Sequence, residues 1–355
     1  MANVTYYLGA GASANALPTY KNFKVRFIEF AQLFSDKYEF PTTEQEDHYR
    51  EKILGLCNEL IRAFDDHNTP DLYAKKLFHQ GGKKLSELKS LLILFFIHQQ
   101  IPRVPRKVER DEVDKRYDNL ISNMLKPIPK EVKFKGNYNI ITWNYDLQFE
   151  LALSKYYEKE VYETSRYIRM EPDITQGRRF EDCDKFSIVH LNGVAYCEAD
   201  YIQNPFEPFE SNYQLFQRLI GLFKKLDQGR ISDMYYSQFL GFAWENLFDN
   251  TKFFDNSKYK EAEKIAARTE VLVIIGYSFP EFNDEIDRQI FERMGTLKKV
   301  YIQDFDKSLA EKLTRLALHP IFMNKNKVQF VDNLNSFHLP AERDKEIHEV
   351  DSNLL

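Results

Sequence analysis

The start of the chain constrains the fold most, because an apolar run over residues 4–8 leads directly into Gly9-Ala10-Gly11-Ala12-Ser13. The apolar run predicts a buried strand, and the small residues predict a tight turn into a helix. Such a turn lets backbone N–H groups approach a diphosphate, whose charge the helix N-terminus stabilises. The same pattern also suits an ordinary strand–helix turn of any α/β protein. No Gly-Lys-Ser or Gly-Lys-Thr follows, which argues against a P-loop nucleotidase.

Further apolar segments have the length and composition of strands. They cover residues 138–143, 186–191, 271–275, 300–303 and 328–331. Most of them end in Gly, Asn, Asp or His, and helical stretches separate them. This alternation predicts an α/β fold, a Rossmann-like doubly wound parallel sheet of about six strands with large helical insertions. Ligands of such sheets bind beyond the carboxyl ends of the strands, where the polar residues of this sequence fall.

Two long stretches between the expected strands have apolar residues at helical spacing. They predict helical insertions at about residues 20–135 and 205–268. Within the first, residues 103–116 are charged and contain Pro105, which predicts a loop or hairpin. We expect one domain over residues 1–338, followed by a polar C-terminal tail over residues 339–355.

Composition excludes several classes of protein. The 355 residues are 43% hydrophobic and 29% charged, as in ordinary globular proteins. The net charge of −5 and the lack of a long basic block give no strong signal for nucleic-acid binding. Three cysteines without a Cys-x-x-Cys pair suit a reducing cytosol and offer no metal framework. With no signal peptide expected and no apolar run long enough for a membrane span, we predict a cytoplasmic protein.

Two expected strands end in groups of polar residues. The first group is Thr142-Trp143-Asn144-Tyr145-Asp146, where Asn144 and Asp146 are candidates for a site or for capping the next helix. The second is His190-Leu191-Asn192-Gly193. Residues i and i+2 of a strand share a face, so we expect His190 and Asn192 to serve the same crevice. A neutral His190 can accept a proton near pH 7, and Asn192 can orient a ribose or a water. The alternative is that His190 is a buried histidine without a catalytic role.

Two later strands supply the remaining candidates. Gly276-Tyr277-Ser278-Phe279 follows residues 271–275, and Asp304 follows residues 300–303. A carboxylate in the position of Asp304 often binds a ribose diol. As a purely structural feature, Gly276-Tyr277-Ser278-Phe279 predicts an ordinary capped turn.

In this order, the motifs resemble the sirtuin family, and specifically its sirtuin-like NAD-cleaving branch. The resemblance implies that Asn144 positions water or the nicotinamide ribose and that Asp146 holds the nicotinamide carboxamide. It also implies a set of residues that bind the NAD itself, namely Gly9–Ser13, Gly193, Gly276, Ser278 and Asp304. The chain departs from the family at one motif, since the usual Lys-Leu-His-Gly is here His190-Leu191-Asn192-Gly193. Asn192 therefore stands where the family has its general-base histidine.

The resemblance also bears on the activity. The family's deacylases contain a zinc ribbon with two Cys-x-x-Cys pairs, which this chain cannot supply. It therefore implies a zinc-free NAD glycohydrolase of bacterial anti-phage defence, which cleaves NAD to nicotinamide and ADP-ribose. The alternative is a non-catalytic subunit that senses NAD or ADP-ribose and works with a partner ATPase or nuclease. The surplus of apolar helical faces predicts a homo-oligomer.

Overall fold

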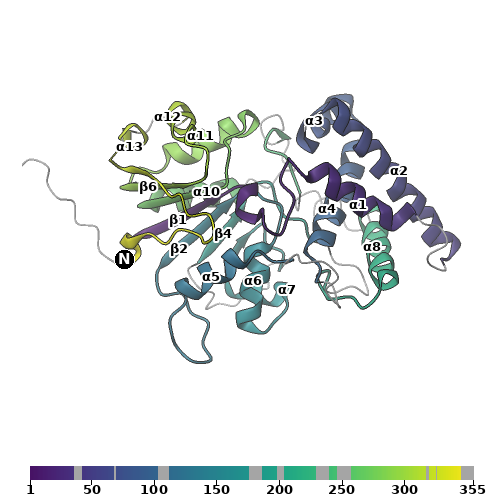
Figure 1. The fold of residues 1–355 in the computed structure, drawn as a ribbon, viewed down its shortest axis with the longest axis horizontal. Helices are drawn as coiled ribbons and strands as arrows, with labels where there is room; N and C mark the ends of the chain where they lie inside the picture. Colours follow the sequence, from purple (N-terminus) through teal and green to yellow (C-terminus); the bar gives the residue numbers. More distant parts are fainter. Residues whose placement is uncertain are drawn as a thin grey trace, which may run out of the picture.

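The computed structural model describes residues 1–35, 42–67, 69–102, 112–175, 186–197, 204–228, 240–245, 257–316, 320–324 and 326–344. Its centre is a seven-stranded parallel sheet in the order β3-β4-β2-β1-β5-β6-β7 (Figure 1). The strands are β1 (Asn3–Leu8), β2 (Asn137–Thr142), β3 (Arg169–Glu171), β4 (Ser187–His190), β5 (Val271–Ile275), β6 (Lys299–Gln303) and β7 (Val328–Phe330). The predicted Rossmann-like α/β fold with helical insertions is thus confirmed.

The strand that the sequence pattern did not predict is β3, at the edge of the sheet. It has three residues, and only the central one, Met170, is buried. So short a segment has no measurable hydrophobic period, so its pairing with β4 had no signal in the sequence. The other strands begin and end within one residue of their predicted bounds.

Helices cover both faces of the sheet (Figure 1). On one face lie α5 (Lys115–Met124), α6 (Gln148–Tyr157) and α7 (Val161–Thr164), and on the other lie α10 (Ser257–Arg268), α11 (Asp284–Glu292), α12 (Leu309–Leu316) and α13 (Pro320–Met323). Successive residues of a strand point to opposite faces. Accordingly, Tyr6 and Ile140 belong to the hydrophobic cluster of the first layer, and Tyr7 and Ile141 to that of the second.

The remaining long helices pack on one another beside the sheet, and we call them the helical body. They are α1 (Phe23–Ser35), α2 (Glu44–Asp66), α3 (Pro70–Gln80), α4 (Lys84–Gln100) and α8 (Asn212–Asp227) (Figure 1). Its central element is α4, in which every residue from Ser90 to Gln100 is buried. Both α5 and α10 fall inside the ranges predicted as insertions but cover the sheet instead. Of the predicted tail, residues 345–355 lie outside the described part of the chain.

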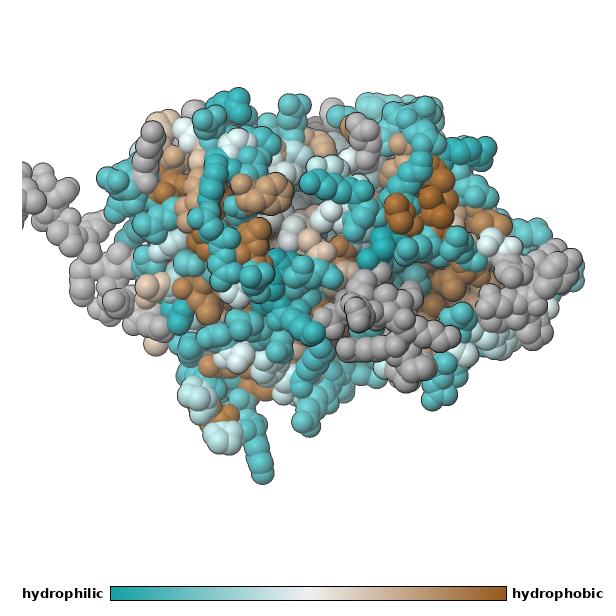
Figure 2. Space-filling model, in the orientation of Figure 1, coloured by the Kyte–Doolittle hydropathy of each residue, from teal (hydrophilic) through white to brown (hydrophobic). Residues whose placement is uncertain are grey.

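The surface in Figure 2 is mostly hydrophilic, with hydrophobic side chains in separate patches. Several large apolar side chains of the helical body are exposed, among them Val25 at 59% and Ile28 at 37% on α1, and Leu72 at 47% on α3. Within the described ranges, no helix combines the length and the hydrophobicity that crossing a membrane requires.

Candidate functional site

Two glycine turns meet where the strand order of the sheet reverses. β1 pairs with β2 on one side and with β5 on the other, and such a reversal is where α/β sheets bind their ligands. The N–H of Gly9 donates to the carbonyl of Ile275 at 3.0 Å, and that of Gly11 to the carbonyl of Gly276 at 2.9 Å. Gly276 has a φ of +58°, and a Cβ built on it would lie 2.4 Å from the Cα of Gly11. Only glycine allows this approach of two backbones.

The turn after β1 differs from its prediction in one respect. It forms a short 3-10 helix, η1 (Ala10–Ser13), and the next α-helix begins only at Phe23. The expected helix N-terminus is therefore not at this turn. The N–H groups of Gly9 and Gly11, which we expected to face a diphosphate, donate instead to carbonyls of Ile275 at the end of β5 and of Gly276 in the turn after it.

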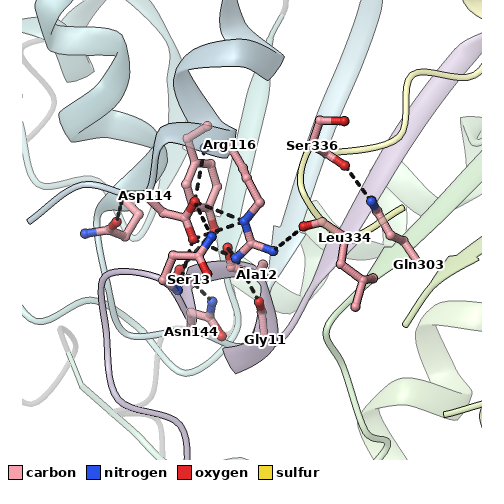
Figure 3. A network of polar contacts seen from close by, with 12 residues as sticks. Gly11, Ala12, Ser13, Asp114, Arg116, Asn144, Gln303, Leu334 and Ser336 are labelled. Carbon is pink, nitrogen blue, oxygen red and sulfur yellow. Dashed lines mark hydrogen bonds and ion pairs between the residues drawn. The ribbon is translucent and has the colours of Figure 1, made fainter. Parts of the chain in front are cut away.

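Arg116 of α5 holds the carbonyl groups of the same turn (Figure 3). Its Nη2 donates to the carbonyl oxygens of Gly11 at 3.1 Å and Ala12 at 3.0 Å. The guanidinium also pairs with Asp114 at 2.6 Å, and Asp114 caps α5 and accepts the N–H of Asn15. Sequence analysis missed Arg116 because the groups that it binds in this turn are backbone carbonyls, which leave no mark in the sequence.

The segment before Phe337 is tied to the same region (Figure 3). Gln303, at the end of β6, donates to the carbonyl oxygens of Asn333 and, at 2.6 Å, of Ser336. Arg116 Nη1 donates to the carbonyl of Leu334 at 3.3 Å. These bonds connect the segment over residues 333–336 to β6 and to Arg116, which holds the first turn.

A cavity of about 300 Å³ lies between the carboxyl edge of the sheet and the helical body. The structure brings eight of the predicted site residues together around it: Gly9, Ala10, Ser13, Asn144, Asp146, Asn192, Gly276 and Ser278. The opposite wall includes Phe23, Asp71 and Phe96 of the helical body. The volume is at the lower end of the range for small-molecule sites.

The other predicted residues are not among the described lining residues of the cavity. Gly11 and Ala12 lie behind the rim against Gly276. Gly193, with a φ of +75°, forms the turn after β4 and donates its N–H to the carbonyl of His190 at 3.0 Å. Asp304 accepts the N–H of Asp306 at 2.9 Å, and partial burial raises its pKa.

His190 is buried beneath the cavity, contrary to the expectation that it shares a crevice with Asn192. β4 ends at His190, so the alternation of a strand does not extend to Asn192. Its Nε2 lies 2.8 Å from Glu150 Oε1 and its Nδ1 lies 3.2 Å from the carbonyl oxygen of Asn144. Burial alone would lower the pKa of His190, but the facing Glu150 carboxylate raises it above its ordinary value. With an acceptor at each nitrogen, the ring holds the Asn144 backbone in place.

Asn144 is fixed on both sides. Its Nδ2 donates to the carbonyl of Gly9 at 3.0 Å and contacts Ser13 Oγ at 3.4 Å, while its N–H donates to Thr142 Oγ1 at 3.0 Å. It does not cap α6, whose N-cap position is Leu147. Asp146 is not the N-cap either, although its Oδ1 accepts the N–H of Gln148, the first residue of α6, at 3.2 Å.

Two carboxyl groups line the cavity from opposite walls. Burial raises the pKa of Asp146 to about 6, although hydrogen bonds from Gln148 and Ser13 lower it in part. Burial likewise raises the pKa of Asp71, at the start of α3, to about 6. The sequence analysis missed Asp71, because it lies in an insertion far from every strand end.

Below the floor of the cavity lies a third carboxyl group, Asp287 of α11, which is fully buried. It accepts hydrogen bonds from the hydroxyl of Tyr7, from Trp143 Nε1 at 2.9 Å and from the hydroxyl of Tyr277 at 2.5 Å. Trp143 and Tyr277 both line the cavity. Burial raises the pKa of Asp287 to about 7 in spite of these donors.

Asp287 gives the protein a predictable pH dependence. An unfolded aspartate has a pKa of about 3.9, so between this value and the folded pKa of about 7 the folded state binds the extra proton. The free energy of unfolding must therefore fall as the pH rises through this window. We expect a lower melting temperature at pH 8 than at pH 5, and a flatter dependence in Asp287→Asn. Thermal melts across this range test it. The exposed Asp118→Asn should keep the wild-type slope, and an unchanged slope in Asp287→Asn would contradict the prediction.

Comparison with known proteins assigns no family to this chain. No protein-family model matches the chain, and a search of curated proteins finds no significant match. Among the residues that the structure describes, no group of three or more His, Cys, Asp or Glu side chains is arranged to hold a metal ion.

Proposed function

We propose that this protein is an NAD glycohydrolase of the sirtuin-like type, which cleaves NAD to nicotinamide and ADP-ribose. One observation carries the proposal. Asn144, Asp146 and Asn192, which come from the ends of two neighbouring strands, line one cavity with the turns of Gly9 and Gly276. These are the motifs on which the resemblance to the NAD-cleaving branch rests, and their meeting around one cavity supports it.

The chemistry suits these side chains. The bond between the ribose anomeric carbon and the pyridinium nitrogen breaks, and the electron pair leaves with nicotinamide. A water oxygen then bonds to the anomeric carbon and its proton goes to solvent. Positive charge develops on the ribose in the transition state, as in other glycoside cleavages. Asp146 would stabilise this charge or hold the carboxamide, and Asn144, fixed by Gly9, would position the ribose or the water.

The proposed reaction uses His190 as a positioning residue. Both of its ring nitrogens face acceptors and it is not among the described lining residues, so it is a poor candidate for a base that contacts substrate. The nicotinamide leaving group is neutral once released, so the bond cleavage needs no general acid, and the attack of water needs only weak assistance.

Incubating the protein with NAD and separating the products tests the proposal. We expect nicotinamide and ADP-ribose in equal amounts, formed at the same rate after treatment with a zinc chelator. Release of acetyl groups from an acetyl-lysine peptide without free ADP-ribose would contradict it. So would a loss of turnover that added zinc restores.

A second candidate is a non-catalytic sensing or assembly subunit, which binds NAD or ADP-ribose and works with a partner ATPase or nuclease. The observation in its favour is that no histidine occurs among the described residues of the cavity wall. Binding of NAD at the cavity without release of nicotinamide would support this candidate and exclude the first.

The proposal also includes a cellular role and an oligomeric state. An enzyme that destroys NAD in the cytoplasm needs a restrained state, which suits a role in bacterial anti-phage defence. The exposed apolar residues Val25, Ile28 and Leu72 of the helical body would serve as a contact between copies in a homo-oligomer. Sedimentation over a wide concentration range measures this assembly.

A further inference from the structure

The polar groups of the cavity are mainly hydrogen-bond acceptors. Two are the carboxyl groups of Asp71 and Asp146. Two more are the amide oxygens of Asn192 and Asn283, which belong to side chains 6% and 3% exposed and have no hydrogen-bond partner. The amide nitrogen of each is occupied, that of Asn192 by the carbonyl of Trp143 at 3.2 Å and that of Asn283 by the hydroxyl of Tyr277 at 2.9 Å. A buried acceptor without a partner is costly, and a ligand with donors removes that cost.

The charged side chains among the described lining residues of the cavity are all acidic. None of the lining residues that the structure describes is a lysine, arginine or histidine. The cavity therefore has nothing to pair with a phosphate group except hydroxyl and backbone donors. Its walls are aromatic, and the rings of Trp143 and Tyr277 stack with their centroids 6.3 Å apart. Aromatic faces and carboxylates together suit a flat, positively charged ring.

Asp71 differs from the other acceptors because the helical body supplies it. It lies in the first turn of α3, after the N-cap Thr69, and its Oδ1 is 3.5 Å from the hydroxyl of Tyr145. An acidic residue in a first turn also stabilises the helix through the dipole. That role would affect folding alone and would not discriminate between ligands of different charge.

We propose that the cavity is a subsite for a cationic aromatic ring that carries hydrogen-bond donors, and that Asp71 makes it select the charged form over the neutral one. The proposal rests on the proposed function, in which this ring is the pyridinium carboxamide of oxidised NAD. The amide oxygens of Asn192 and Asn283 accept from the carboxamide N–H groups, and Asp71 and Asp146 face the ring charge. The reduced, neutral dihydropyridine has the same carboxamide but no ring charge for these carboxylates to stabilise.

Two small probes separate charge from shape. Methylnicotinamide, methylated on the ring nitrogen, has a permanent positive charge, whereas nicotinamide has the same carboxamide and is neutral. Calorimetric titration should show that the wild-type protein binds the cation more tightly. In Asp71→Asn the ratio of the two affinities should fall about fivefold, the effect of one half-buried, partly screened charge. Asp66→Asn removes the charge of an exposed aspartate at the end of α2, and it should keep the wild-type ratio.

Each outcome decides the proposal. Binding of nicotinamide by Asp71→Asn shows that the variant has kept its fold, and a lower ratio then supports the assignment. An unchanged ratio leaves Asp71 with a role in the helix only and overturns the proposal, as does a wild-type protein that binds neither probe or prefers the neutral one. The measurement needs no turnover. A protein that selects the cation but releases no nicotinamide from NAD would refute the hydrolase and leave the cation subsite standing.

Discussion

Replacing Asn144 with alanine should reduce the rate of nicotinamide release from NAD by about a hundredfold or more, because the proposed reaction relies on this fixed side chain to position the ribose or the water. The variant should stay folded. The lost bonds to Gly9 and Ser13 are worth about 1 kcal/mol, while the bond from the Asn144 N–H to Thr142 does not involve the side chain. Initial rates measured together with thermal melts check both statements.

Asn123→Ala provides the matched control, since this half-buried asparagine bonds only to the carbonyl of Asn119 on its own helix among the described contacts. It should keep wild-type turnover. A folded Asn144→Ala protein with nearly normal turnover would remove Asn144 from the site and with it the main support for the proposed mechanism.

Gly276→Ala should destabilise the protein by about 3 kcal/mol or more, through two effects. The residue has a φ of +58°, which is unfavourable for alanine. The added Cβ would also lie 2.4 Å from backbone atoms of Gly11, which cannot rotate away as a side chain can. Chemical denaturation measures the change, and NAD turnover should fall with it because the rim of the cavity is displaced.

The control for this substitution is Gly55→Ala in α2, where a Cβ meets no atom within 4 Å. Alanine there should stabilise the helix by about 0.5–1 kcal/mol. If Gly276→Ala proved as stable as the wild type, the close contact between the two turns would not exist in solution.

The features that could be predicted from the sequence are those with a local signal. A buried parallel strand is rich in apolar residues, and β5 is a continuous apolar run, so its bounds could be found directly. The bounds of β1 and β2 could be found to within one residue, although Thr5 and Asn139 interrupt their apolar residues. The polar residues after these strands meet because the carboxyl ends of parallel strands share an edge. That rule places Asn144 and Gly276 at one cavity without any knowledge of the loops between them.

The features that could not be predicted depend on contacts between distant segments. Arg116 binds the carbonyls of a turn about a hundred positions earlier, and carbonyls are present in every residue. Asp71 reaches the cavity only because the helical body packs beside the sheet. For His190 and Asn192, the rule that residues i and i+2 share a face does not hold, because β4 ends at His190 and the chain turns at Leu191 and Asn192.

The contact between the Gly9–Ser13 turn and the Gly276 turn also bears on how the protein would be kept inactive. Each turn is bonded to the other, and Arg116 holds the first from behind, so this rim is assembled when the chain folds. A ligand would not have to organise it, and binding would lose little conformational entropy there. To keep the protein inactive by disordering this rim, the core of the sheet would have to be disrupted. Control of the reaction would therefore act on access, through the wall that the helical body contributes.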